Sequence, residues 1–75
     1  MVRLRIKKVI DEKGLTMAKV ARQANMAYNT VHSLCVDPYK YVNLYTLNRI
    51  AEALEVSVRD LLEDAPDDLS KNDNK

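Results

Sequence analysis

The sequence contains few of the residues that interrupt regular secondary structure, with one glycine and two prolines among 75 residues. Sandwiches and barrels need many tight turns, which draw on glycine and proline, so this composition argues against an all-β fold. Phenylalanine and tryptophan are absent, and the aromatic residues are four tyrosines. Because a core needs some large side chains, we expect one or two of Tyr39, Tyr41 and Tyr45 to cover it.

A single cysteine, Cys35, excludes an intramolecular disulfide and a cysteine-rich zinc site. We expect it to be a small buried residue in a cytoplasmic protein. No apolar run approaches the roughly 18 residues of a membrane span, and no signal-peptide pattern precedes the first expected helix.

Catalytic patterns are also absent from the sequence. The one histidine, His32, has no second ligand at metal spacing and no nucleophile or acid that would complete a triad. No glycine-rich loop could hold a phosphate group. We therefore expect no enzyme, no cofactor and no metal.

Charge is distributed unevenly along the chain, although the net charge is only +1. Residues 1–50 carry nine basic and three acidic side chains, and residues 51–75 carry three basic and eight acidic ones. A basic N-terminal part suits a polyanionic partner such as a nucleic acid. The alternative is that these charges only solvate the helix surfaces.

Apolar spacing predicts five helices within a domain of residues 1–64, which is an all-α fold. The helices are expected at about 2–13, 17–24, 28–35, 44–54 and 58–63. Residues 65–75 are polar, and we expect a disordered tail.

Residues at the helix ends agree with these boundaries. Gly14 ends the first helix, and Thr16 can cap the second. Asp37 precedes a proline and therefore ends the third helix. Asn43 can cap the fourth, and Ser57 with an aspartate three residues later resembles a capping box for the fifth.

The most informative segment is the helix pair around Asn25, at about residues 16–36. Asparagine tolerates the left-handed backbone of a sharp turn, and Ala21 is small enough for two helices to cross closely. Val31 and Leu34 would anchor the second helix of the pair. Its outer face then carries hydrogen-bonding groups and no acid: Tyr28, Asn29, Thr30, His32 and Ser33.

Several short stretches, in this order and spacing, resemble the Cro/phage-repressor type of helix-turn-helix protein, the lambda-repressor-like or XRE family. They are Lys-Gly-Leu-Thr at 13–16, Val-Ala-Arg-Gln-Ala at 20–24, Tyr-Asn-Thr-Val-His-Ser-Leu at 28–34, Leu-Asn-Arg-Ile-Ala-Glu-Ala-Leu-Glu-Val-Ser at 47–57 and Asp-Leu-Leu at 60–62. The resemblance covers about residues 3–63 and implies a compact five-helix lambda-repressor-like domain.

The resemblance also implies how the chain would contact duplex DNA. The base-contacting residues would be Tyr28, Asn29 and Ser33, with His32 beside them. The phosphate-contacting residues would be Thr16, Met17, Thr30, Lys40, Tyr41 and Asn43. Three positions depart from the family pattern: Met17 replaces a glutamine, Asn25 replaces the turn glycine, and Cys35-Val36-Asp37 replaces a Glu-Asn-Gly run.

The favoured function is a transcriptional regulator, a repressor that reads an inverted repeat as a homodimer on DNA. Val58, Leu61 and Leu62 are the candidate dimer interface, although one of the two leucines must also close the core. One alternative is an antitoxin that represses its own operon and binds a toxin through the acidic tail from Asp64. Another is a protein-interaction module that has lost DNA binding, as Met17 and the scarcity of arginine near the third helix would allow.

Overall fold

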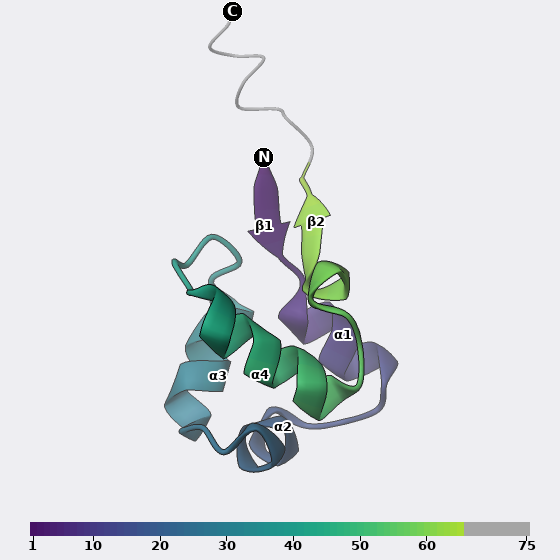
Figure 1. Cartoon of the computed structure of the whole chain (residues 1–75), viewed down its shortest axis with the longest axis vertical. Helices are drawn as coiled ribbons and strands as arrows, with labels where there is room; N and C mark the ends of the chain where they lie inside the picture. Colours follow the sequence, from purple (N-terminus) through teal and green to yellow (C-terminus); the bar gives the residue numbers. More distant parts are fainter. Residues whose placement is uncertain (66–75) are drawn as a thin grey trace, which may run out of the picture.

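The computed structural model describes residues 1–65. The elements follow the order β1 (Val2–Leu4), α1 (Ile6–Glu12), α2 (Met17–Ala24), α3 (Tyr28–Val36), α4 (Leu44–Leu54), the 3-10 helix η1 (Val58–Leu61) and β2 (Leu62–Asp64). The helices form one bundle, and the two strands project from it side by side with the N-terminus at their tip (Figure 1). The predicted disordered tail lies, except for Ala65, outside the described residues. No helix within residues 1–65 has the length and apolar character needed to cross a bilayer.

The helix ends confirm the capping predictions. Thr16 Oγ1 accepts a hydrogen bond from the Lys19 backbone N–H, at 3.1 Å. Asn43 Oδ1 accepts one from the Thr46 N–H at 2.8 Å. Ser57 forms both halves of its capping box. Each bond satisfies an N–H group that the helix leaves unpaired at its start, so short-range sequence rules were sufficient here.

The all-α, five-helix prediction is wrong at both ends of the domain. The first helix begins only at Ile6, and the segment expected as a fifth helix is a single 3-10 turn followed by β2. The fold is therefore a mostly helical domain with four α-helices and a two-stranded antiparallel sheet, in which Val2 lies opposite Asp64 and Leu4 opposite Leu62. This pairing joins opposite ends of the domain, so local apolar spacing could not reveal it.

Charged side chains hold one face of the sheet. Glu63 accepts a hydrogen bond from Arg3 at 2.6 Å, and Arg5 and Lys8 lie 3.8 and 3.6 Å from its other carboxylate oxygen. The bond from Arg3 holds the pKa of the Glu63 carboxyl below its ordinary value. On the backbone, the Leu4 N–H donates to the carbonyl of Pro38 at 2.8 Å. The sheet therefore also anchors the loop that follows α3.

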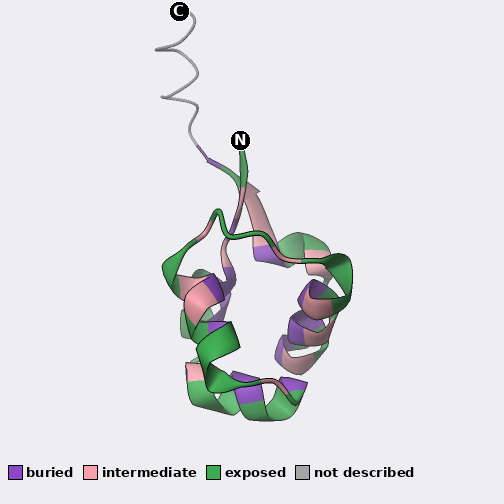
Figure 2. Cartoon of the chain, turned by 90° about the vertical axis from the view of Figure 1, so that its left-hand side faces the viewer, coloured by how far each residue is buried: buried purple, intermediate pink, exposed green. Residues whose placement is uncertain are grey.

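The core lies between the four helices and the base of the sheet, and Figure 2 shows the buried residues on the sides of the elements that face one another. Ile50, Val20, Val31 and Leu61 are each 0% exposed. Leu61 is thus the leucine that closes the core, and its prediction as a dimer-interface residue is wrong because none of its surface is left for a partner.

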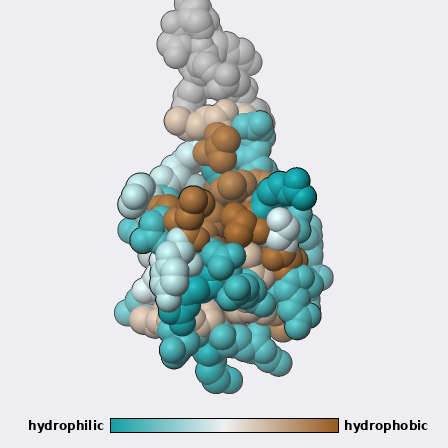
Figure 3. Space-filling model, in the orientation of Figure 1, coloured by the Kyte–Doolittle hydropathy of each residue, from teal (hydrophilic) through white to brown (hydrophobic). Residues whose placement is uncertain are grey.

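Apolar side chains also gather on the surface over the start of α4, η1 and the strands (Figure 3). Val2, Val42 and Leu62 line one shallow hollow there, and Leu44 is 75% exposed at the start of α4. Val58 is half-buried on η1. We name these five residues the apolar face. Exposed apolar surface of this kind is typical of contacts between protein chains.

Candidate nucleic-acid interface

The turn between α2 and α3 has the geometry that the sequence predicted. Asn25 adopts the left-handed conformation, with φ 57° and ψ 49°. The next residue, Met26, donates its N–H to the carbonyl of Ala21 at 2.8 Å, which closes the end of α2. Ala21 itself is 3% exposed and belongs to the core, as expected for a small residue beside the turn. The two helices joined by this turn, α2 and α3, span residues 17–36.

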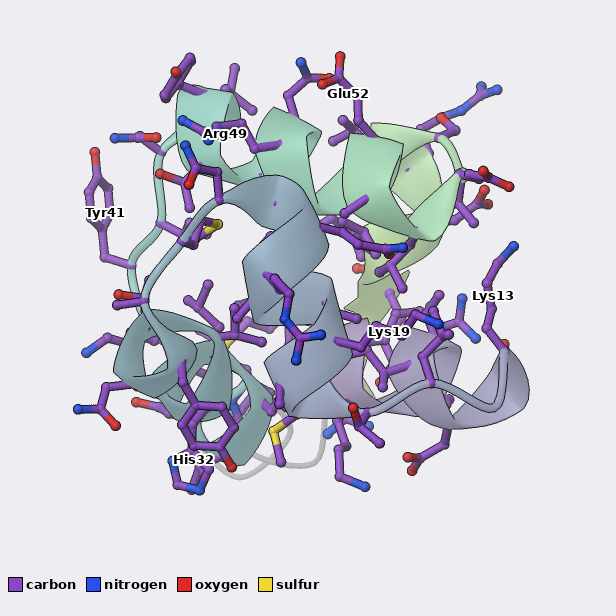
Figure 4. The ribbon with its side chains drawn as sticks, turned by 90° about the horizontal axis from the view of Figure 1, so that it is seen from below. Lys13, Lys19, His32, Tyr41, Arg49 and Glu52 are labelled. Carbon is purple, nitrogen blue, oxygen red and sulfur yellow. The ribbon has the colours of Figure 1, made fainter. Side chains whose placement is uncertain are left out.

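The outer face of α3 brings together three of the predicted base-contacting residues. Tyr28, Asn29 and His32 are all exposed, while Val31 and Leu34 hold the opposite side of the helix in the core. The rings of Tyr28 and His32 stack with centroids 5.8 Å apart and an interplanar angle of 26°. His32 points away from the body of the molecule (Figure 4).

Ser33 is less available than the other three. It is half-buried, and its hydroxyl donates to the carbonyl of Thr30 at 3.1 Å, one turn earlier. The Ser33 hydroxyl has therefore used its proton within α3 and can only accept a hydrogen bond from a partner.

The start of α3 has no side-chain cap, because Ala27 occupies the cap position. Backbone N–H groups of the first helical turn then lack an intrahelical partner and point out of the helix end. Together with the positive end of the helix dipole, such groups favour an anion. The exposed hydroxyl of Thr30 lies in the same turn.

The start of α2 carries the first two predicted phosphate contacts, Thr16 and Met17. The Thr16 hydroxyl oxygen already accepts the capping bond, which leaves its proton free to donate. The Met17 side chain is half-buried and packs against the core, and a thioether cannot donate a hydrogen bond. The backbone N–H is the donor that Met17 can offer at this position.

The loop after α3 carries the remaining predicted phosphate contacts. Lys40 and Tyr41 are exposed, Tyr41 by 87%, and Figure 4 shows Tyr41 projecting from the molecule. Asn43 uses its side-chain oxygen to cap α4 and keeps its amide N–H groups as donors. Tyr39 and Tyr45 are 52% and 68% exposed, so the expectation that a tyrosine of this series covers the core is wrong.

Cys35 lies at the end of α3, half-buried beside the core rather than fully buried. Burial raises the pKa of its thiol, so the sulfur stays protonated and poorly nucleophilic at neutral pH. Within residues 1–65, no three His, Cys, Asp or Glu side chains come together as a possible metal site.

Arg49 contacts the end of α2 beside the turn, and sequence reasoning did not predict this contact. It belongs to α4 and donates to the backbone carbonyl of Ala24 at 2.7 Å, across 25 residues of sequence. A basic residue on an amphipathic helix is ordinarily a solvated side chain, so no local signal indicated this contact.

Comparison with known proteins agrees with this geometry. Residues 5–67 match the family model of the Cro/C1-type helix-turn-helix DNA-binding domain. A crystal structure from Bacteroides fragilis, titled as that of a "putative DNA-binding protein", is 33% identical in sequence and superposes with a TM-score of 0.73. That match covers 84% of this chain and 100% of the other. No curated protein sequence matches the chain. The chain belongs to the Cro/C1-type helix-turn-helix DNA-binding family.

Proposed function

We propose that this protein is a transcriptional regulator, a repressor that binds an inverted repeat in duplex DNA and reads it with α3. DNA binding is the property of its family. The observation that carries the finer proposal is the outer face of α3, which is exposed, free of acidic residues and held at a fixed angle by the turn at Asn25.

The base-reading roles follow from the chemistry of the exposed side chains. Asn29 can form two hydrogen bonds with N6 and N7 of an adenine in the major groove. Tyr28, stacked on His32, can pack against a thymine methyl or a sugar, and His32 can donate to a base or phosphate beside it. Ser33 can accept a hydrogen bond from an exocyclic amino group.

The phosphate contacts lie on either side of that face. Lys40 supplies the charge, and Tyr41, Thr30 and Thr16 supply hydroxyl donors. The side-chain amide of Asn43 and the backbone N–H of Met17 complete the set. Such contacts set the register of the protein on the duplex, whereas base contacts decide the sequence.

A second copy of the chain is the proposed partner for the apolar face. One helix-turn-helix contacts few base pairs, and a two-fold related pair reads two half-sites about one helical turn apart. In an isologous contact, the same patch meets itself. None of the five residues of the apolar face is charged, and Arg3 and Lys40 line the same hollow beside them. Val58 and Leu62, predicted as interface residues from the sequence, belong to this face.

Selection of bound sequences from a random duplex pool tests the proposal. We expect an inverted repeat to be enriched and the Asn29→Ala variant to lose about 1–3 kcal/mol of discrimination at one position of each half-site. Asn48→Ala, the same change on an exposed part of α4, is the matched control and should keep the wild-type motif. Affinity should fall steeply with salt. A motif unchanged by Asn29→Ala, or affinity independent of salt, would refute the role given to α3.

The dimer contact is tested with Leu44→Lys, because Leu44 is the most exposed residue of the apolar face. The added positive charge by itself strengthens binding to DNA. A loss of affinity for the full inverted repeat therefore indicates that the contact between the two copies of the chain is lost. We expect weaker cooperative binding in sedimentation and mobility-shift titrations and unchanged affinity for a single half-site. Val36→Lys, at a 64% exposed apolar position outside the face, is the control. Equal cooperativity in both variants would exclude this surface.

Nothing within residues 1–65 favours the antitoxin alternative, since its expected toxin-binding segment runs from Asp64 into the chain beyond them.

A further inference from the structure

Arg49 joins the middle of α4 to the end of α2. Its Nη2 atom donates to the carbonyl oxygens of Ala24 at 2.7 Å and Asn25 at 3.4 Å. Its Nη1 atom donates to the Tyr45 hydroxyl at 3.0 Å, and the guanidinium lies 5.5 Å from the centre of the Tyr45 ring. One half-buried side chain therefore connects α4, the last residue of α2 and the first residue of the turn.

The two carbonyl groups that Arg49 contacts accept no hydrogen bond from the N–H groups of the turn. A helix ends with carbonyl groups that have no intrahelical partner. The N–H groups of Asn25 and Met26 already donate to Arg22 and Ala21. The Arg49 guanidinium binds the carbonyls of Ala24 and Asn25 and places a positive charge at the negative end of the α2 dipole. It thus completes the C-terminal cap of α2 from another helix.

Arg49 is not used as an ordinary surface charge. No carboxylate within residues 1–65 lies within ion-pair distance of it, unlike the basic side chains around Glu63. In the view from below, Arg49 and His32 lie on opposite sides of the molecule (Figure 4). The guanidinium therefore faces the turn and lies away from the proposed DNA-reading face.

We infer that Arg49 is a positioning residue that sets the angle of α3 by clamping the turn before it, without touching DNA. α3 begins at Tyr28, three residues after Asn25, so a change in the turn moves the whole reading face. Base contacts need this face in register, whereas attraction to phosphates tolerates small rotations. The inference rests on the proposed role of α3, and it predicts that Arg49 affects specificity more than general attraction to DNA.

The test compares Arg49→Met with the wild-type chain on two duplexes over a range of salt concentrations, at a temperature where circular dichroism shows both proteins folded. One duplex carries the selected inverted repeat, and the other is unrelated in sequence. We expect about a tenfold loss of affinity for the inverted repeat, the factor expected when hydrogen bonds from a charged donor are removed. Affinity for the unrelated duplex and the slope of affinity against salt should stay unchanged.

Three further variants distinguish the effect of the Arg49 hydrogen bonds from the effects of lost charge and lost stability. Arg22→Met removes the same charge from the last turn of α2, where the side chain is exposed, and should keep the specific-to-unspecific ratio. Arg49→Lys keeps the charge and one donor group and should recover part of the ratio. Tyr45→Phe removes a single hydrogen bond to the guanidinium and should cause a smaller loss than Arg49→Met.

The salt slope decides between positioning and direct contact. A slope that falls by about one in Arg49→Met would mean that the side chain contacts a phosphate, which overturns the inference. An unchanged ratio, or an equal loss in Arg22→Met, would also overturn it.

Hydrogen exchange in the free protein tests the role of Arg49 independently of the proposed DNA binding. Exchange of the Met26 amide, which closes the turn, should become faster in Arg49→Met and not in Arg22→Met. If the wild-type chain selects no motif, the proposed function fails. In that case the exchange rates still show whether Arg49 holds the turn.

Discussion

Replacing Leu61 with alanine is expected to lower the free energy of unfolding by about 2–5 kcal/mol, the cost of a large cavity in a packed core. Leu61 is 0% exposed at the end of η1, and its carbonyl accepts the Arg5 N–H at 2.8 Å. A domain of this size has a total stability of only about 5–15 kcal/mol. The Tm should therefore fall by at least about 8 °C in thermal unfolding followed by circular dichroism.

Leu44→Ala is the matched control for this prediction, because it removes the same atoms from a side chain that is 75% exposed. Its stability should stay within about 0.5 kcal/mol of the wild type. The opposite result for Leu61→Ala, with an unchanged Tm and a smaller sedimenting species, would place Leu61 in an interface between chains instead of the core.

Replacing Ala21 with leucine should disrupt both the fold and DNA binding. Ala21 is 3% exposed on α2 and belongs to the packed core, so three additional carbon atoms have little room there. Overpacking of this kind costs about 1–3 kcal/mol and forces backbone shifts. Because α3 is the element that moves, we expect affinity for the selected inverted repeat to fall at least about tenfold, beyond any effect of partial unfolding. Unfolding in urea and mobility-shift titration at low temperature measure the two effects separately.

Ala18→Leu is the control for the stability effect, since Ala18 is exposed on the same helix. Its free energy of unfolding should change by no more than about 0.5 kcal/mol. If Ala21→Leu were tolerated as well as Ala18→Leu, the crossing of α2 and α3 would not depend on a small residue.

The elements that short-range rules describe were predictable from the sequence. α2 and α4 have the boundaries expected from apolar spacing, and Thr16, Asn43 and the capping box at Ser57 act as caps. Each of these features involves residues three or four positions apart, so the local sequence contains all the interacting partners.

The sequence was sufficient to predict which face of α3 forms the candidate site. Once Val31 and Leu34 are assigned to the core, helical geometry turns Asn29 and His32 outward and places Tyr28 at the edge of that face, where it is 47% exposed. The state of individual side chains was not predictable. The Ser33 hydroxyl donates within its own helix, a choice that depends on rotamers and not on residue type.

The sequence by itself determined the helix-turn-helix, because its turn, caps and core positions are local and mutually consistent. Only the tertiary structure decided the ends of the domain, where β1 and β2 pair and Leu61 enters the core. It also decided that Arg49 of α4 donates a hydrogen bond to the last residue of α2. The reason is the same in each case: these interactions join different elements of the chain, and apolar periodicity does not show which distant groups will meet.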